Sequence, residues 1–400
     1  MSLVLSPRRA ILMPGPWVRD ELWRRARAVP SLDLRFADSK SLIDAISGLS
    51  LITYTRASSG TSVGSGRMVE TAGTNVPRFE HDPATGECLG FLYEGEVRSN
   101  LLLQNRTLTA AAWVATNITT AKDQTGADGV GNSASSITAT AANGTILQAI
   151  TSASTARATS AYVKRITGSG AIEMTQNGGA TWTAVTVTSS WSRVSIPSAT
   201  VTNPSVGFRI ATSGDAIAVD YVQCENGAFV TSAIETTTAA VTRNADVVSI
   251  TGAAFSSWYR QDEGTVFADV IRTYSGNFPN FPNIYRFNNG TTDNEIMLFG
   301  GQNSQYLRPQ IRASAAEQLD FVSFNTLFPG PNRSAHSFAI NQSVFAANGA
   351  LTTPDTSVSM PTVDRLNLGV REGQQFTGCY RRITYWPQRL SNSALQALTR

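Results

Sequence analysis

Residues 213–221 read SGDAIAVDY, a turn followed by a short apolar strand. Ser-Gly-Asp is typical of a tight turn, and Ile217 and Val219, two positions apart, place β-branched side chains on one face of a strand. The same alternation recurs around predicted strands at 183–188 and 192–196. Several short strands separated by Gly and Asn turns indicate a β-sandwich or barrel.

A second all-β unit follows a Ser/Thr/Ala-rich bridge at 232–241. It closes with a short helix that Ser391 can cap, with Leu395 and Leu398 facing inward. We therefore predict a mainly β protein of two tandem antiparallel sandwiches (jelly rolls), at 99–245 and 246–400. The strands predicted in the second unit are 265–271, 295–299, 365–368 and 382–386.

The composition excludes several classes of protein. A length of 400 residues predicts two to three domains at roughly 150 residues each. The net charge is only +3, so a broad nucleic-acid-binding surface is not expected. No apolar run approaches the ~20 residues of a membrane-spanning helix, and no secretory signal is evident. We therefore expect no membrane partner and no export directed by a signal peptide of this chain. The lack of such a signal disfavours a free secreted lectin.

The first thirty residues differ from the rest of the chain. Residues 16–29 predict a short helix, and six Arg against Asp20 and Glu21 give residues 1–30 a charge of +4. A helix this short is marginal in water, so it needs a partner, either its own chain or a larger assembly. We favour the assembly, with 1–30 as a basic amphipathic anchor before a hairpin-rich neck at 31–98. The expected anchoring residues are Trp17, Arg19, Leu22, Trp23, Arg24, Arg25 and Arg27.

Several stretches resemble tailed-bacteriophage virion proteins. LDLRFADSKSL at 32–42, TYTRAS at 53–58 and RFEHDPATGE at 78–87 look like a module common in those proteins. Residues 94–103 resemble its exit into a carbohydrate-binding-module-like jelly roll, whose last strand and exit resemble 219–232 and 242–246. Residues 368–369, 376–378 and 382–387, with the terminal helix, are similar to concanavalin A-like lectin/glucanase sandwiches of phage fibres.

This resemblance implies a structural protein of a phage or phage-like virion. The chain would be a head or tail fibre, a spike or a capsid decoration, made in the host bacterial cytoplasm. Residues 1–30 would join it to a capsid, vertex or tail protein, and the sandwiches would contact a host-surface glycan. Such fibres imply a homo-oligomer, with a trimer favoured.

The sequence offers little catalytic chemistry, and we expect no enzyme. The two histidines, His81 and His336, lie far apart and near no nucleophile elbow. A lectin/glucanase sandwich carries its acids as E-x-D-x-E on one strand, and neither Asp269 nor 293–295 reproduces that spacing. The alternative is a virion-associated polysaccharide depolymerase.

Glycan binding needs exposed aromatic faces with polar partners. The densest candidate is the stretch 274–285, where Tyr274, Phe278, Phe281 and Tyr285 alternate with Asn and Pro. These rings can contact a sugar, or they can pack under the loop or in a subunit interface. Trp182 carries the same two alternatives.

We expect no cofactor. Asp123, Asp128 and Glu225 could hold a structural calcium ion, as jelly rolls of this resemblance do, although no Asp-rich calcium loop appears. Cys88, Cys224 and Cys379 are far apart, without the spacing of a zinc site, and are expected to be buried thiols.

Overall fold

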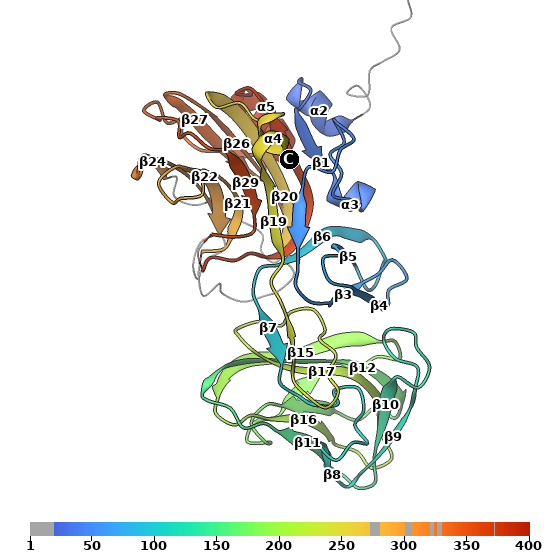
Figure 1. Cartoon of the computed structure of the whole chain (residues 1–400). Helices are drawn as coiled ribbons and strands as arrows, with labels where there is room; N and C mark the ends of the chain where they lie inside the picture. Colours follow the sequence, from blue (N-terminus) through green and yellow to red (C-terminus); the bar gives the residue numbers. More distant parts are fainter. Residues whose placement is uncertain (1–19, 273–280, 301–305, 321–323, 326–329, 372) are drawn as a thin grey trace, which may run out of the picture.

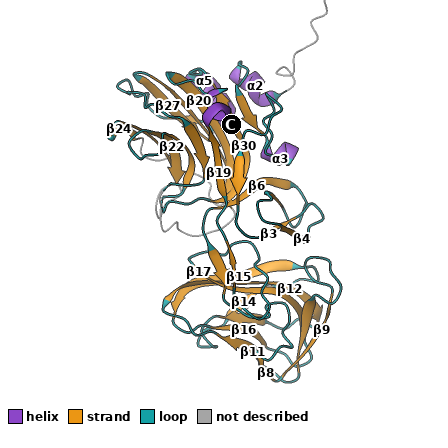
Figure 2. Ribbon diagram, in the orientation of Figure 1, coloured by secondary structure: helices purple, strands orange, loops and turns teal. Residues whose placement is uncertain are grey.

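The computed structural model describes residues 20–272, 281–300, 306–320, 324–325, 330–371 and 373–400. It forms two lobes joined by a narrow waist (Figure 1). Strands dominate both lobes (Figure 2), and the named strands pair antiparallel throughout the described residues. The predicted fold class, mainly β with antiparallel sandwiches, is confirmed.

The first lobe is a sandwich of two five-stranded sheets, ordered β15-β12-β17-β10-β9 and β14-β13-β16-β11-β8. Ile217 and Val219 are fully buried between the sheets, as their alternation predicted, among mostly aliphatic side chains such as Ile137 and Val206. The strands are β8 (Val114–Thr116), β9 (Ile118–Gln124), β10 (Ala134–Ala139), β11 (Gly144–Ala149), β12 (Thr155–Thr167), β13 (Ile172–Thr175), β14 (Thr183–Val185), β15 (Ser192–Val201), β16 (Ser205–Ile210) and β17 (Ala216–Asn226).

The second lobe is a larger sandwich whose two main sheets run β28-β27-β26-β20-β30-β6-β5 and β2-β19-β29-β21-β22-β23-β24. The last helix starts at the predicted cap Ser391 and buries Leu395 and Leu398. Its C-terminal elements are β19 (Val247–Thr251), α4 (Gly252–Ser256), β20 (Glu263–Arg272), β21 (Asn283–Asn288), β22 (Glu295–Gly300), β23 (Tyr306–Ala313), β24 (Ala316–Asp320), β25 (Phe324–Asn325), β26 (Gly330–Ala339), β27 (Gln342–Ala347), β28 (Ala350–Leu351), β29 (Arg365–Leu368), β30 (Thr377–Trp386) and α5 (Asn392–Thr399).

Residues 31–98, which the sequence assigned to a neck, supply strands to this second sandwich. β1 and β6 both pair with β30, and β2 pairs with β19. Phe36 and Phe91 lie in the same core as Tyr380, with the two Phe ring centroids 5.6 Å apart. The elements of this segment are β1 (Leu32–Leu34), α3 (Phe36–Ser39), β2 (Thr53–Thr55), β3 (Gly60–Val63), β4 (Val69–Ala72), β5 (Arg78–His81) and β6 (Cys88–Glu94).

The jelly roll is inserted into the second sandwich rather than placed before it. The chain leaves through β7 (Arg98–Asn100) and returns through β18 (Val241–Arg243), and these two strands pair antiparallel as a stem. The second lobe is therefore built from residues that precede the jelly roll and residues that follow it. The predicted tandem arrangement instead placed one sandwich after the other along the chain.

The N-terminal helix is shorter than expected and packs on its own chain. α2 (Glu21–Ala26) begins at Asp20, whose carboxylate accepts from the Trp23 backbone, and ends at Arg27, which has a φ of 55°. Trp23 is 5% exposed, and its indole donates to Asp33 at 3.0 Å. Arg25 donates to the carbonyls of Ala397 and Arg400.

These contacts correct the expectation that a neighbouring protein covers the helix. The apolar side of residues 20–30 packs against β30 and α5 of the same chain. Ala26 and the half-buried Leu22 contact the cluster that contains Trp386 and Leu398. None of the helices among the described residues has the length and apolar character needed to cross a bilayer.

Candidate functional site

Trp182 is held in a fixed position on the jelly roll by the turn that precedes β14. The Asn177 side chain accepts hydrogen bonds from the Thr181 backbone and the Thr175 hydroxyl, both at 2.9 Å. Gly179 has a φ of +89°, and a Cβ there would lie 3.0 Å from the indole. The turn therefore needs glycine both for its backbone conformation and for room beside the ring.

An ion pair lies beside this half-exposed indole. Arg209 on β16 places its guanidinium 4.8 Å from the centroid of the Trp182 ring, a cation–π contact. Glu173, directly across on β13, accepts from Arg209 Nε at 2.5 Å. We call Trp182, Arg209 and Glu173 the tryptophan platform. It combines a half-exposed aromatic ring with a guanidinium donor and a carboxylate acceptor.

Two of the aromatic residues predicted at 274–285, Phe281 and Tyr285, lie in the part of the chain that the structure describes. Tyr285 is 1% exposed and lies in the core of the second sandwich, so its prediction as a glycan contact was wrong. Its place on β21, which is buried on both sides, is the physical reason. Phe281 is half-buried against Phe299, with ring centroids 5.7 Å apart. Tyr274 and Phe278 lie outside the described residues.

The predicted anchoring residues fall into three groups. Trp17 and Arg19 lie outside the described residues. Leu22, Trp23 and Arg25 contact the chain itself, whereas Arg24 on α2 and Arg27 directly after it are exposed.

The two histidines are buried in separate places, and the serine beside His336 is itself fully buried. His336 is fully buried on β26, and burial lowers its pKa to about 3. Its Nε2 lies 2.9 Å from the Ser343 hydroxyl. His81 places Nδ1 3.0 Å from the Val63 carbonyl. Neither ring is arranged as the base of a catalytic triad.

The acids considered for calcium do not converge. Asp128 pairs with Arg106 at 2.7 Å, and Glu225 accepts from the Thr231 backbone at 2.7 Å. Asp123 is exposed on β9. Within the residues that the structure covers, no three His, Cys, Asp or Glu side chains form a group that could hold a metal ion.

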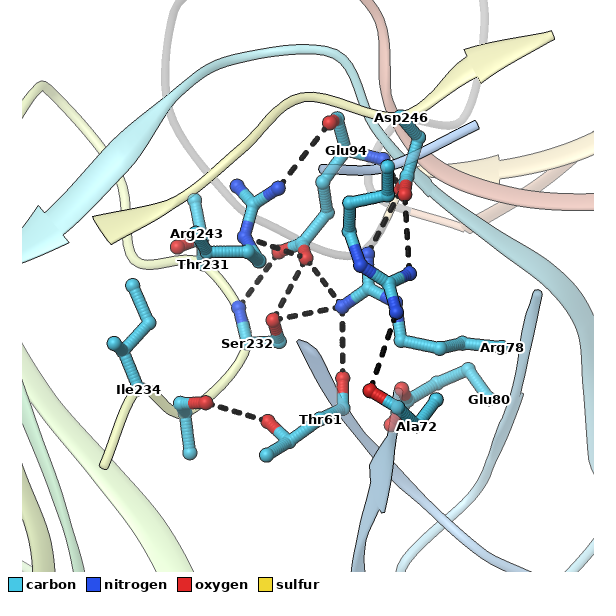
Figure 3. A network of polar contacts seen from close by, with 12 residues as sticks. Thr61, Ala72, Arg78, Glu80, Glu94, Thr231, Ser232, Ile234, Arg243 and Asp246 are labelled. Atoms are coloured by element: carbon cyan, nitrogen blue, oxygen red, sulfur yellow. Dashed lines mark hydrogen bonds and ion pairs between the residues drawn. The ribbon is translucent and has the colours of Figure 1, made fainter. Parts of the chain in front are cut away.

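The waist contains a buried ionic network that sequence reasoning missed (Figure 3). Arg78 on β5 pairs with Glu94 at 2.7 Å and with Asp246 at 2.8 Å. Arg56 also pairs with Asp246, and Arg243 pairs with Glu94 at 3.1 Å. These five side chains, which we call the waist network, come from the neck segment, the β18 strand and the start of the second sandwich.

The arginines of the waist network stabilise the ionised form of its buried carboxylate Glu94. Burial alone would raise the pKa of Glu94, but Arg243 and Arg78 outweigh it and hold that pKa at about 2. Ser232, in the connection from the jelly roll to β18, donates to both oxygens of Glu94 at 2.7 Å. The network therefore ties the connection of the jelly roll to the frame of the second sandwich.

A pocket of about 330 Å³ lies beside this network. Its wall includes Glu80 and His81 from β5, Tyr162 and Arg193 from the jelly roll, and Thr377 from β30. Burial raises the pKa of Glu80 to about 7, although the Val63 backbone donates to this carboxyl. A sequence gives no signal for this pocket, because its wall joins positions as distant as 80, 193 and 377.

Comparison with known proteins gives only partial likenesses. No protein-family model and no curated protein matches the chain. The CBM40 domain of the Ruminococcus gnavus IT-sialidase, in complex with alpha2,3 sialyllactose, is 21% identical, with 35% of this chain and 84% of that chain covered and a TM-score of 0.31. A NanB sialidase variant from Streptococcus pneumoniae is 16% identical, with 37% of this chain and 26% of that chain covered and a TM-score of 0.31.

The Trypanosoma rangeli sialidase is 14% identical, with 38% of this chain and 25% of that chain covered and a TM-score of 0.31. The chain thus spans about a quarter of each of the two whole sialidases.

Proposed function

We propose that the chain is a non-enzymatic structural protein of a tailed-phage or phage-like virion, a fibre or spike whose jelly roll binds host-surface glycan. The tryptophan platform carries the glycan-binding part of the proposal. The turn that carries Trp182 is fixed by the hydrogen bonds of Asn177 and lies close to the indole at Gly179, so binding a sugar there would order little of the protein. Arg209 and Glu173 supply a donor and an acceptor beside that ring.

The waist network supports the structural part of the proposal. A fibre must transmit force between its attachment and its binding face, and a buried set of ion pairs with well-defined geometry opposes bending between the two lobes. Because Leu22, Trp23 and Arg25 contact the chain itself, we propose that attachment to other virion proteins uses residues 1–19, which include Arg8, Arg9 and Trp17, together with the exposed Arg24 and Arg27. We also propose that the fibre is a homo-oligomer, most favourably a trimer.

The test of the adhesive role compares two tryptophans of the jelly roll. Trp182→Ala should reduce binding of the full chain to host-surface polysaccharide by at least tenfold, equivalent to about 1.4 kcal/mol, without shifting the thermal midpoint. Trp191→Ala is the matched control, because Trp191 is also half-exposed and contacts Lys164 at 5.2 Å, outside the platform. Equal loss in both variants, or no loss in either, would contradict the platform.

The test of the structural role uses particles. Deletion of residues 1–19 should leave both lobes folded and abolish incorporation, and normal incorporation would refute the attachment. Release of reducing sugar from capsule or lipopolysaccharide by the purified chain would replace the adhesive role with the alternative, a virion-associated depolymerase.

A further inference from the structure

A two-stranded ribbon of the neck segment extends from the second sandwich to the jelly roll (Figure 1). Among the named strands of the described chain, β3 and β4 pair only with each other, so this ribbon belongs to neither main sheet of the second sandwich. The turn between the two strands is tight, because the Gly64 backbone donates to the Met68 carbonyl at 2.8 Å. We call residues 60–72 the strap.

The β3 half of the strap is held on the second sandwich by side chains of β5. Arg78 donates to the Thr61 carbonyl at 2.8 Å, and the Val63 backbone donates to Glu80 at 3.2 Å. His81 Nδ1 lies 3.0 Å from the Val63 carbonyl. Three consecutive contacts of this kind fix the strap to the frame of the second sandwich, although it shares no sheet with that frame.

The strap also contacts the jelly roll, through both polar and apolar groups. The Val69 backbone donates to the Ala127 carbonyl at 2.9 Å. The side chain of Val69 is buried in a small apolar cluster with Ala127, Tyr221 and Ala233. The Thr61 hydroxyl donates to the Ala233 carbonyl at 2.6 Å. The strap therefore joins the two lobes.

The jelly-roll loop that meets the strap fits it closely and is itself held in place. A Cβ at Gly129 would lie 2.5 Å from Sδ of Met68, so the glycine leaves the room that this methionine occupies. The Ala127 backbone donates to Asp220 on β17 at 2.9 Å, and Asp220 accepts from Arg106 at 2.7 Å. A force on the strap is therefore passed to the sheet of the jelly roll.

The stem by itself does not fix the angle between the lobes. β7 and β18 are three residues long each, and an isolated two-stranded ribbon is only marginally stable. Parts of a chain that are joined by short connections move relative to each other by default. The stem and the waist network both act on the connections of the jelly roll, at β7, β18 and Ser232. The strap acts on the body of the jelly roll, and two separate points of attachment remove the rotation that one point allows.

We propose that the strap fixes the orientation of the jelly roll, so that the lobes form one rigid body while the strap is docked and swing about the stem when it is not. The consequence for adhesion rests on the proposed function. A docked strap holds Trp182 in one direction relative to the attachment of the chain. Copies on one particle would then present their tryptophan platforms alike and bind one surface together.

The test measures the distance between the lobes. Spin labels are placed by Thr116→Cys on β8 and Ser257→Cys after α4, both exposed, in a chain that carries Cys88→Ser. Pulsed electron paramagnetic resonance should give one narrow distance distribution. Val69→Asp places a carboxylate in the apolar cluster and should at least double the width of that distribution. Val76→Asp is the matched control, because Val76 is 47% exposed in the same segment, and should leave the width unchanged.

Hydrogen exchange of the Val69 amide tests the strap without any substitution at the contact. Its acceptor belongs to the other lobe, so protection of this amide requires a docked strap. It should exchange at least about a hundredfold more slowly than an unstructured amide. Exchange at the unstructured rate would overturn the proposal even if Val69→Asp folds poorly.

Equal widths in Val69→Asp and Val76→Asp, with cooperative unfolding retained in both, would also overturn it. Neither measurement involves a glycan or a particle. The strap can therefore fail while the adhesive role stands, and an unchanged affinity for polysaccharide in Trp182→Ala would remove the platform while leaving the strap intact.

Discussion

The two sandwiches differ in how they obtain their cores. The jelly roll is filled by mostly aliphatic side chains, and its strands follow one another along the chain from Val114 to Asn226. The second sandwich is rich in aromatic contacts. The ring centroids of Phe255 and Trp258 lie 5.0 Å apart, and those of Tyr259 and Tyr385 lie 5.2 Å apart. Its core also takes Phe36 and Phe91 from residues that precede the jelly roll.

This difference has a consequence for folding. A sandwich whose strands are contiguous can close as soon as its own residues are made, because each loop that must be ordered is short. The second sandwich needs β1 and β6 beside β30, hundreds of residues later, so its core closes only with the whole chain. The paired stem of β7 and β18 lets the inserted lobe form without disturbing that closure.

The largest expected effect comes from separating the lobes. Excised residues 98–243 should unfold cooperatively, whereas residues 246–400 alone should show no cooperative transition, because they lack Phe36, Phe91 and the strand partners of β30. Thermal unfolding followed by circular dichroism checks both pieces. A cooperative transition in 246–400 would show that the early strands are dispensable.

The next largest effect should come from the waist network. Asp246→Ala removes the acid that faces both Arg56 and Arg78 and leaves buried guanidinium groups without it, so unfolding should become easier by about 3–5 kcal/mol. Denaturant titration measures the loss. The matched control is Asp262→Ala, which removes an exposed partner of Arg260 and should leave the free energy of unfolding nearly unchanged. Similar losses in the two variants would mean that the network does not hold the waist.

The smallest effect concerns pH. The pKa of Glu80 is raised from 4.5 to about 7, so the folded state holds this proton more tightly than the unfolded state. The free energy of unfolding therefore falls as the pH rises from about 4.5 to about 7. Glu80→Gln should remove roughly 1–2 kcal/mol of that fall between pH 5 and 7.

Glu87→Gln is the control for this experiment, because Glu87 is exposed on the same β5–β6 hairpin. Its pH profile should match that of the unchanged protein. An unaltered slope in Glu80→Gln would show that Glu80 titrates at its ordinary value.

The local elements were predictable where pattern and environment agree. The strand 365–368 and the helix after Ser391 occur where their alternation and capping signals predicted, because each depends on residues next to it in sequence. Tyr285 shows where such reasoning fails. An aromatic residue in an Asn/Pro-rich stretch can face solvent or a core, and only the position of β21 between β29 and β22 placed it inside.

The N-terminal helix also shows what a local pattern can and cannot predict. Its amphipathic stripe correctly indicated that α2 needs a partner, but it could not identify the partner. The contacts of Trp23 with Asp33 and of Arg25 with the carbonyl of Arg400 decide that residues 20–30 pack on this chain.

By itself the sequence determined a mainly β chain, the apolar faces of its strands and the capped final helix, because these follow from periodicities of two or four residues. Only the tertiary structure decided that the jelly roll is an insertion, that three arginines and two acids meet in a buried network at the waist, and that a pocket lies beside them. Those features arise when residues hundreds of positions apart are desolvated together, and no local pattern encodes which of them will meet.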